Sequence, residues 1–305
     1  RVGAIGVTVA NVSEAEVMAA SGIEDILIAH LVVGDSKAKR LAALQRHSNV
    51  KATIDHPDQI GPIEAAAARA NTRIGLLVDV NLGMNRTGVE TPEDAATLAA
   101  RIAGSSSLTF LGVMGYEGHT LMIEDPSAKR QAIFAAHDRL SAAVQAVNRR
   151  GLECSIVSAG GSGSYQFAAD HPALTELQAG GGVFYCNYYA QACHVAGHEP
   201  ALFVLASVVS RPAADRIILD IGQKSVSPYR VMPTLPSLPT AEVQILSAEH
   251  ATLKVPPDCP LRIGDTVNVI PGYSDFTFVL HDEVLGIRDG LVESCWKLSG
   301  RGMLQ

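Results

Sequence analysis

The chain has 305 residues, of which 47% are hydrophobic and 18% are charged, a size that suits two ordinary domains or one large α/β domain with a smaller one. The net charge of −7 argues against nucleic acid or an anionic membrane surface as the main partner, and no apolar run approaches the ~20 residues that cross a bilayer. The five cysteines are odd in number and contain no CxxC pair. Reduced thiols in a cytoplasmic protein are therefore favoured over a disulfide framework.

Strand-like and helix-like segments alternate along the first two thirds of the chain. Apolar, β-branched runs predict strands at 5–10, 26–33, 50–54, 74–80, 108–114 and 155–157, and one more is expected at 182–185. Amphipathic stretches predict helices from Ser13, where Glu16 completes a capping-box pattern, and then at 37–46, 63–70, 92–102, 127–149 and near Tyr165. At least seven such repeats precede residue 195. They predict a (β/α)8 barrel rather than an open sheet.

The last third of the chain has a different pattern. Helical periodicity stops at about Pro200, and prolines cluster at 228, 233, 236 and 239. Short strand-like runs follow at 202–210, 216–220, 241–247 and 266–270. We therefore expect a barrel domain over 1–198 and a mostly antiparallel β domain over 199–305.

Ligand-binding residue types gather in the loops after the predicted barrel strands, where barrel enzymes carry their chemistry. Arg86 follows the strand at 74–80, and Tyr116 and His119 follow the strand at 108–114. Two glycine-rich segments, 158–164 and 179–182, come later. Backbone N–H groups without a Cβ nearby are suited to cradling phosphate. Taken one at a time, Arg86 could form a surface salt bridge, His119 could be an ordinary loop histidine, and the glycine-rich segments could be ordinary turns. Taken together, they predict a site for a phosphorylated aromatic cofactor.

Six segments in a characteristic order carry a resemblance to a known family: 6–16, 79–88, 115–119, 158–164, 176–180 and 271–282. With these segments the chain resembles the pyridoxal-phosphate enzymes that have an alanine-racemase-type barrel, specifically the D-threonine aldolase and D-serine dehydratase group. The resemblance extends over essentially the whole chain.

The resemblance implies a role for each matched residue. The cofactor phosphate would be held by Ser158, Gly160, Gly161, Ser162, Gly163 and Ser164, together with Gly181 and Gly182. Arg86 would face the pyridine nitrogen and, because a guanidinium keeps its proton, would leave that nitrogen unprotonated and the ring a weaker electron sink. Tyr116 and His119 would lie near the cofactor and the substrate's side chain. The family also implies a small D-amino acid as substrate and a homodimer in which the second domain closes the barrel of the partner subunit.

The chain departs from the family at the Schiff-base lysine. That lysine lies on the first barrel strand, a little upstream of the segment matching 6–16. The seven lysines of this chain stand elsewhere, and Lys51 lies at the start of a predicted strand, the wrong end for the site. We therefore expect the first β/α unit of the barrel, with its lysine, to be missing from the sequence shown.

A second departure concerns the family's divalent metal (Mn, Mg or Zn). The group has a histidine and then a cysteine or aspartate two residues later, whereas this chain has Tyr273 and Asp275. If this segment is a regular strand, His281 shares their face but lies ~20 Å from Asp275, too far for one metal. Two alternatives follow. Either the metal has been lost, which we favour, or Asp275 holds it with His119 or water.

The predicted activity is that of a lyase acting on β-hydroxy-D-amino acids. Retro-aldol cleavage to glycine and an aldehyde is favoured because Asp275 matches the aldolase form of the motif. His119 or Tyr273 would serve as the base in the absence of a metal. The alternatives are a deaminating D-serine or D-hydroxyaspartate dehydratase, an amino-acid racemase, and a non-catalytic pyridoxal-phosphate-binding protein.

Overall fold

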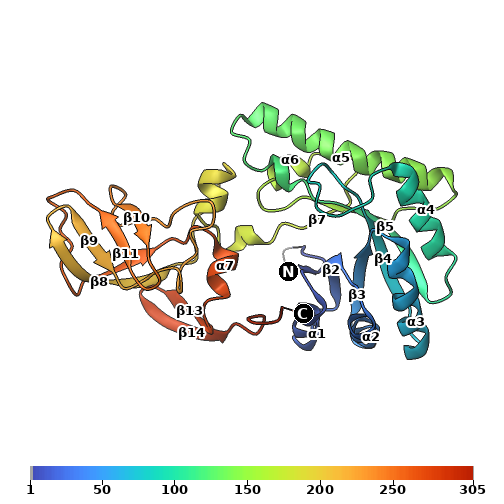
Figure 1. Cartoon of the computed structure of the whole chain (residues 1–305), viewed down its shortest axis with the longest axis horizontal. Coiled ribbons are helices and arrows are strands. Elements are labelled where there is room, and N and C mark those ends of the chain that lie inside the picture. The colour runs from blue at the N-terminus through green and yellow to red at the C-terminus, as the bar shows by residue number, and fades with distance from the viewer. Residues whose placement is uncertain (1–2, 305) are drawn as a thin grey trace. The chain divides into compact units, whose positions relative to one another are not determined.

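A computed structural model describes residues 3–304 and divides the chain into two compact units (Figure 1). The first unit contains the chain up to Ala179 and its C-terminal end from Met303, and the second unit runs from Gly180 to Gly302. The predicted boundary between residues 198 and 199 stays a prediction. No helix among the described residues is both long enough and apolar enough to cross a membrane.

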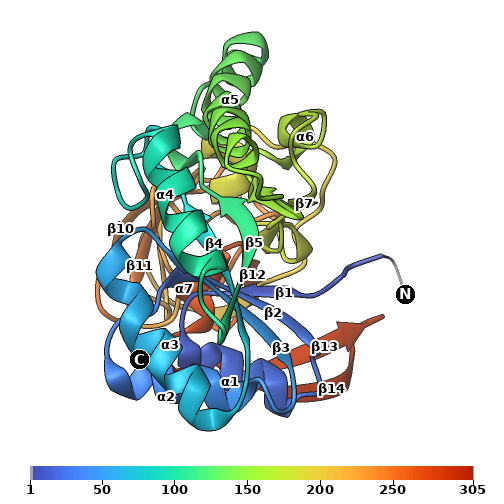
Figure 2. The ribbon, with the colours of Figure 1, turned by 90° about the vertical axis from the view of Figure 1, so that its right-hand side faces the viewer.

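The first unit is built on seven parallel strands that pair in chain order and curl as a half-barrel (Figures 1 and 2). The strands are β1 (Val7–Val9), β2 (Asp25–Leu31), β3 (Asn49–Ile54), β4 (Ile74–Asp79), β5 (Leu108–Met114), β6 (Ile156–Ala159) and β7 (Glu176–Leu177). The helices are α1 (Val12–Ala20), α2 (Asp35–Leu44), α3 (Ile60–Ala70), α4 (Pro92–Ala103), α5 (Pro126–Arg149) and α6 (Tyr165–Ala168), with short 3-10 helices at Pro57–Gln59 and Gly118–Thr120. The predicted parallel α/β barrel is thereby confirmed.

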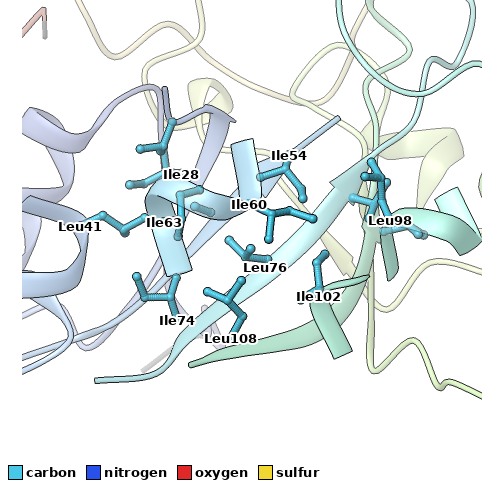
Figure 3. Close-up of a cluster of buried hydrophobic side chains, with 14 of the residues drawn as sticks. Ile28, Leu41, Ile54, Ile60, Ile63, Ile74, Leu76, Leu98, Ile102 and Leu108 are labelled. Carbon is cyan, nitrogen blue, oxygen red and sulfur yellow. The ribbon is translucent and has the colours of Figure 1, made fainter. Parts of the chain in front are cut away.

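The core of this unit lies between the strands and the helices that follow them (Figure 3). Ile28, Ile54 and Leu76 from the sheet meet Leu41 and Ile63 from the helices, and all five are fully buried. A smaller cluster of Leu27, Leu77 and Met114 lies apart from this core. Because successive side chains of a strand point to opposite faces, Leu76 and Leu77 belong to different layers. Burial on both faces explains why these strands read as continuous apolar runs.

Two local predictions in this unit are wrong. Asn11, not Ser13, caps α1: its side chain accepts the N–H of Glu14, and the Glu14 carboxylate accepts the N–H of Ala10 at 2.7 Å. Ser13 is buried and accepts a hydrogen bond from Arg40 at 2.6 Å. The stretch 182–185 does not form a strand either. The seventh strand is the two-residue β7, and the following glycines begin a 3-10 helix (Gly181–Val183) in the second unit.

The second unit is antiparallel, as predicted. Its main sheet has the strand order β10-β11-β9-β8-β12, and a separate hairpin pairs β13 with β14. The elements are β8 (Val204–Ala213), β9 (Arg216–Leu219), β10 (Glu242–Leu246), β11 (Ala251–Lys254), β12 (Thr266–Val269), α7 (Ser274–Phe278), β13 (Glu283–Arg288) and β14 (Leu291–Lys297), with a π-helix at Tyr188–Ala192. The sequence did not predict β11, β13 or β14. A core of aliphatic side chains including Ile217, Leu219 and Leu253 fills this unit.

Candidate active site

Parallel strands bring their carboxyl ends to one edge of the sheet, and the candidate residues of the first unit follow those ends. The Arg86 loop follows β4, the Tyr116 and His119 turn follows β5, and the glycine–serine loop follows β6. Since β4, β5 and β6 are adjacent in the sheet, these three segments are neighbours.

Asn81 organises the loop that carries Arg86. Its side-chain oxygen accepts the backbone N–H groups of Gly83 and Asn85 at 2.9 and 3.1 Å, and its amide nitrogen donates to Glu90 at 2.8 Å. The loop closes at Gly88, which has a φ of 103°. A Cβ there would lie 2.4 Å from the backbone nitrogen of Asn81, so only glycine fits. These contacts are local in sequence, and one long-range bond joins them, from the N–H of Gly88 to the carboxylate of Asp55 at 3.0 Å.

Arg86 is exposed and presents its guanidinium to an aromatic ring. Its Cζ lies 5.7 Å from the centroid of the Tyr116 ring, within cation–π range. No carboxylate of residues 3–304 lies within ion-pair distance of it. A small pocket between the loop and Tyr116 is lined by Asp79, Asn81 and Arg86, among others. The cation is thus available to a ligand rather than engaged in a surface salt bridge.

The turn after β5 packs against both neighbouring loops through glycine. A Cβ on Gly161 would lie 3.2 Å from Cε2 of Tyr116, and one on Gly83 would lie 3.1 Å from Nε2 of His119. Tyr116 therefore borders the glycine–serine loop, while the exposed His119 borders the arginine loop. The structure brings together Arg86, Tyr116 and His119, as the sequence predicted.

The glycine–serine loop differs from the predicted open cradle. The backbone N–H of Gly161 donates to Oγ of Ser164 at 3.0 Å, and the N–H of Ser164 donates back to the Gly161 carbonyl at 3.0 Å. The N–H of Gly160 donates to Glu117 at 3.3 Å. Three amides of the loop are thus bonded to protein, whereas the N–H of the buried Gly163 finds no acceptor among the described residues.

Ser158 is fully buried at the end of β6, and its hydroxyl accepts the side-chain amide of Gln178 at 2.9 Å. The N–H of Gln178 donates to the carbonyl of Gly160 at 3.2 Å. These two bonds attach the start of the loop to the end of β7. Ser158 therefore has a structural partner within the sheet, and its predicted contact with a phosphate stays a prediction.

Glu117, for which no role was predicted, is buried in the turn that carries Tyr116 and His119. Its side chain is 0% exposed and lies 3.1 Å from the equally buried Nε2 of His137 on α5. It also accepts the hydroxyl of Ser164. Burial acts to raise the pKa of Glu117, but the contacts with His137 and Ser164 outweigh it and hold that pKa below its ordinary value.

Asp79, at the end of β4, is buried, and its pKa is strongly altered by this environment. Burial raises its pKa to about 6, with a smaller contribution from the charge of Asp55, while a 2.7 Å bond from Thr87 opposes the rise. The folded protein therefore binds this proton more tightly than the unfolded chain does. Stability is favoured while Asp79 is protonated and falls as pH rises from about 4 to 6.

We expect the Asp79→Asn variant to lack this loss of stability, because asparagine stays neutral and still accepts from Thr87. A shift of about two pKa units corresponds to ~3 kcal/mol. Between pH 4 and pH 7, the free energy of unfolding of the wild type should fall by about that amount relative to the variant. Urea titrations of both full-length proteins at several pH values would measure it. Parallel pH profiles would show that Asp79 titrates normally.

In the second unit, Gly181 packs against Tyr189: a Cβ on Gly181 would lie 2.3 Å from the tyrosine oxygen. The predicted role of Gly181 and Gly182 in phosphate binding stays a prediction.

The segment with Tyr273 and Asp275 is a helix start and not a strand, so the predicted shared strand face with His281 is wrong. Tyr273 is extended and precedes α7. Its hydroxyl nevertheless reaches Asp275 and donates to Oδ2 at 2.6 Å. His281 lies beyond the helix, where its Nε2 is 2.7 Å from the carbonyl oxygen of Ser225. Tyr273 also packs edge-on against Tyr188 and Phe276, with centroids 5.1 Å apart in each pair.

These donors do not fit a divalent metal. Burial, followed by the charge of Asp275, raises the pKa of Tyr273 far above its ordinary value, which disfavours the phenolate that a metal ligand requires. One oxygen of Asp275 is already engaged by the tyrosine. Among residues 3–304 no three histidine, cysteine or acidic side chains are grouped as a metal site.

Lys51 lies near the start of β3, the end of the sheet opposite the site. It is buried, with 5% of its surface exposed, and pairs with Asp25 on β2. It is therefore a structural lysine at the wrong edge for a cofactor, as the sequence predicted.

Comparisons with known proteins agree with this architecture. Residues 1–187 match the alanine racemase N-terminal domain, and residues 201–287 match a putative serine dehydratase domain. The D-threonine aldolase of an Arthrobacter species is 32% identical over 98% of this chain and 80% of its own length. The 3-hydroxy-D-aspartate aldolase of Paracoccus denitrificans (strain Pd 1222) is 33% identical over 98% of this chain and 79% of its own length.

Among solved structures, D-threonine aldolase from Filomicrobium marinum superposes with a TM-score of 0.95 at 33% identity, covering 99% of this chain and 84% of that one. Family matches over both units, two curated relatives above 30% identity and a near-complete structural match all agree. The chain belongs to the alanine-racemase-type family that includes D-threonine aldolase and 3-hydroxy-D-aspartate aldolase.

Proposed function

We propose that this protein is a pyridoxal-phosphate-dependent lyase that cleaves β-hydroxy-D-amino acids to glycine and an aldehyde. The observation that carries the proposal is the grouping of Arg86, Tyr116 and His119 beside the glycine–serine loop at the carboxyl ends of adjacent strands. Both curated relatives described above are aldolases, which supports cleavage of a carbon–carbon bond.

The residues of the first unit fit a phosphorylated planar ring. Arg86 has no ion-pair partner in the described part of the chain and stands over an aromatic ring, so it can donate to a ring nitrogen. The N–H of Gly163 is an unused donor at the end of β6, next to two further serines, and suits an anionic group. We propose that Ser158, Gly160, Gly161, Ser162, Gly163 and Ser164 surround the phosphate, with Gly181 and Gly182 as further candidates.

When bound, pyridoxal phosphate supplies an electron sink for negative charge at the substrate's Cα. The protein's own task is to remove the proton of the β-hydroxyl. We assign this to His119, because an exposed imidazole beside the arginine loop can reach a substrate and imidazole is the side chain most often used as a general base. Tyr116 would border the cofactor ring.

In the second unit, we propose that Tyr273 and Asp275 contact the substrate as a hydrogen-bonded pair. The raised pKa of Tyr273, caused by burial and by Asp275, keeps its proton in place. Tyr273 therefore acts as a donor, and of the two candidate bases His119 is favoured. Since these donors do not fit a divalent ion, we propose a metal-independent enzyme.

The test is to incubate the full-length protein, loaded with pyridoxal phosphate, with D-threonine and separately with L-threonine. We expect one glycine and one acetaldehyde for each D-threonine consumed, and no turnover of the L-isomer. Ammonia with a keto acid would indicate a dehydratase, and interconversion of D- and L-isomers a racemase. Cofactor binding without turnover of any β-hydroxy-D-amino acid would indicate a non-catalytic binding protein.

We further propose that the enzyme is a cytoplasmic homodimer with a domain boundary near residue 198. All five cysteines are free, which suits a reducing compartment. The family resemblance supports the dimer.

A further inference from the structure

The buried carboxylate of Glu117 joins three separate parts of the first unit. It lies in the turn after β5, and its oxygens meet the N–H of Gly160 at 3.3 Å, the hydroxyl of Ser164, and Nε2 of His137 at 3.1 Å. The first two partners belong to the loop after β6, and the third belongs to α5. Glu117 and His137 are both 0% exposed.

Glu117 also shapes its own turn through its backbone. Its carbonyl accepts the N–H of Thr120 at 2.9 Å and the hydroxyl of Thr120 at 2.8 Å. Tyr116 and His119 flank Glu117 in this turn. A single residue thus sets the conformation of the turn that carries two candidate site residues and holds the adjacent loop.

Burying a charged side chain in a protein core is unfavourable for the free energy of folding. Removing a carboxylate from water costs several kcal/mol that contacts must offset, and apolar residues of the same size often give equal or greater stability. The His137 ring adds to the cost, because neither Nδ1 nor Nε2 forms a hydrogen bond with the described residues, although Nε2 lies 3.1 Å from the Glu117 carboxylate. Overall stability alone therefore does not explain why a glutamate occupies this position. The hydrogen bonds explain it, since an apolar side chain could not accept the Gly160 N–H or the Ser164 hydroxyl and so could not orient them.

The hydrogen bonds of Ser164 connect Glu117 to the rest of the loop. Its hydroxyl donates to Glu117, which orients the oxygen to accept the N–H of Gly161 at 3.0 Å. The amides of Gly160 and Gly161 are in this way turned toward protein, whereas the N–H of Gly163 has no acceptor in the described chain.

We propose that Glu117 is a positioning residue that holds the 160–164 loop in the conformation that receives the cofactor's phosphate, an inference that rests on the proposed function. Glu117 does not touch the cofactor itself. It acts through Ser164 and Gly160, and its carboxylate also lies 3.1 Å from Nε2 of His137.

The test compares the affinities of full-length apoprotein for pyridoxal 5′-phosphate and for pyridoxal, which lacks the phosphate. In Glu117→Gln, which keeps the volume but loses the charge, we expect the dissociation constant for pyridoxal phosphate to rise about 10-fold or more, by analogy with the outer-shell partners of metal ligands. The dissociation constant for pyridoxal should stay unchanged. Glu124→Gln, at an exposed glutamate on the same connection, is the matched control and should leave both affinities unchanged.

A merely structural role would weaken both ligands together or neither, and either outcome would overturn the inference. If the wild type itself binds pyridoxal phosphate no better than pyridoxal, the proposed function fails instead. Ser164→Ala removes only the hydroxyl between Glu117 and Gly161, and it carries the same test if Glu117→Gln does not fold. An unchanged ratio of the two dissociation constants in Ser164→Ala would then refute the role of Glu117.

Discussion

Replacing Arg86 with alanine should lower kcat/KM for D-threonine cleavage by about 10²–10³-fold, the loss typical of removing one preorganised electrostatic contact in a catalytic site. The cation has no ion pair within residues 3–304 and lies 5.7 Å from the centroid of the Tyr116 ring. Its guanidinium therefore lines the small pocket beside Tyr116 and is not neutralised by an ion pair within the described chain. The loop itself should persist, because Asn81 and Gly88 determine its conformation.

Steady-state assays and visible spectra of the full-length enzyme would measure this effect. Arg86→Lys should recover part of the activity, since lysine keeps the charge but not the planar donor geometry. Arg46→Ala, at an exposed arginine between α2 and β3, should leave both readouts unchanged. Unchanged turnover and spectrum in Arg86→Ala would show that Arg86 is an ordinary surface residue.

The wild-type enzyme should keep its activity after dialysis against EDTA, whereas Tyr273→His should become dependent on added manganese or zinc. The substitution places an imidazole two residues before Asp275, where the tyrosine hydroxyl already reaches Oδ2 at 2.6 Å. Removing the tyrosine also frees that carboxylate oxygen to bind a metal. Added metal should raise the activity of Tyr273→His by about 10-fold or more, the size of the effect seen when a partner in a metal site is lost.

Two further variants separate the possible outcomes. Tyr273→Phe removes the hydroxyl and should lower turnover without creating a response to metal. Asp275→Asn combined with Tyr273→His should abolish the metal response. If the wild type loses activity in EDTA and regains it with metal, then Asp275 recruits another ligand and the proposed metal independence is wrong.

The parallel unit was predictable because its strands are buried on both faces. Ile74–Asp79 and Leu108–Met114 are apolar runs with helices on either side in the sequence. The two-residue β7 has no such run, and it is defined by its pairing with β6 through Ser158 and Ala159. The glycines that follow it begin a 3-10 helix, so the predicted strand at 182–185 is wrong.

In the second unit, a strand-like alternation lies in a helix start, and a turn motif marks the last hairpin. Tyr273 and Asp275 match a strand period, yet the Tyr273 carbonyl accepts the Thr277 hydroxyl at 2.8 Å, at the start of a helix. The hairpin of β13 and β14 turns at Asp289 and Gly290, with φ values of 50° and 77°. Asp-Gly between such segments is the strongest short hairpin signal, so this hairpin was predictable in principle.

The candidate site was predictable where a family motif names a residue, and not where burial decides its role. Arg86, Tyr116 and His119 lie together as expected. Glu117 was not predictable, because a glutamate in a loop is ordinarily exposed. Its importance arises from His137, twenty positions later on α5, and sequence spacing does not reveal that contact.

The glycines that separate the site loops determine which positions a mutagenesis library can vary. Side chains at Gly88 or Gly115 would collide with backbone atoms at 2.4 and 2.7 Å, and neighbouring backbone cannot yield cheaply. At Gly83 and Gly161 the nearest atoms belong to the side chains of His119 and Tyr116, at 3.1 and 3.2 Å. Randomising the first pair would mostly produce unfolded clones. Substitutions at the second pair would instead change the orientation of the His119 and Tyr116 rings. At Gly83 the left-handed backbone restricts the replacements to residues such as asparagine.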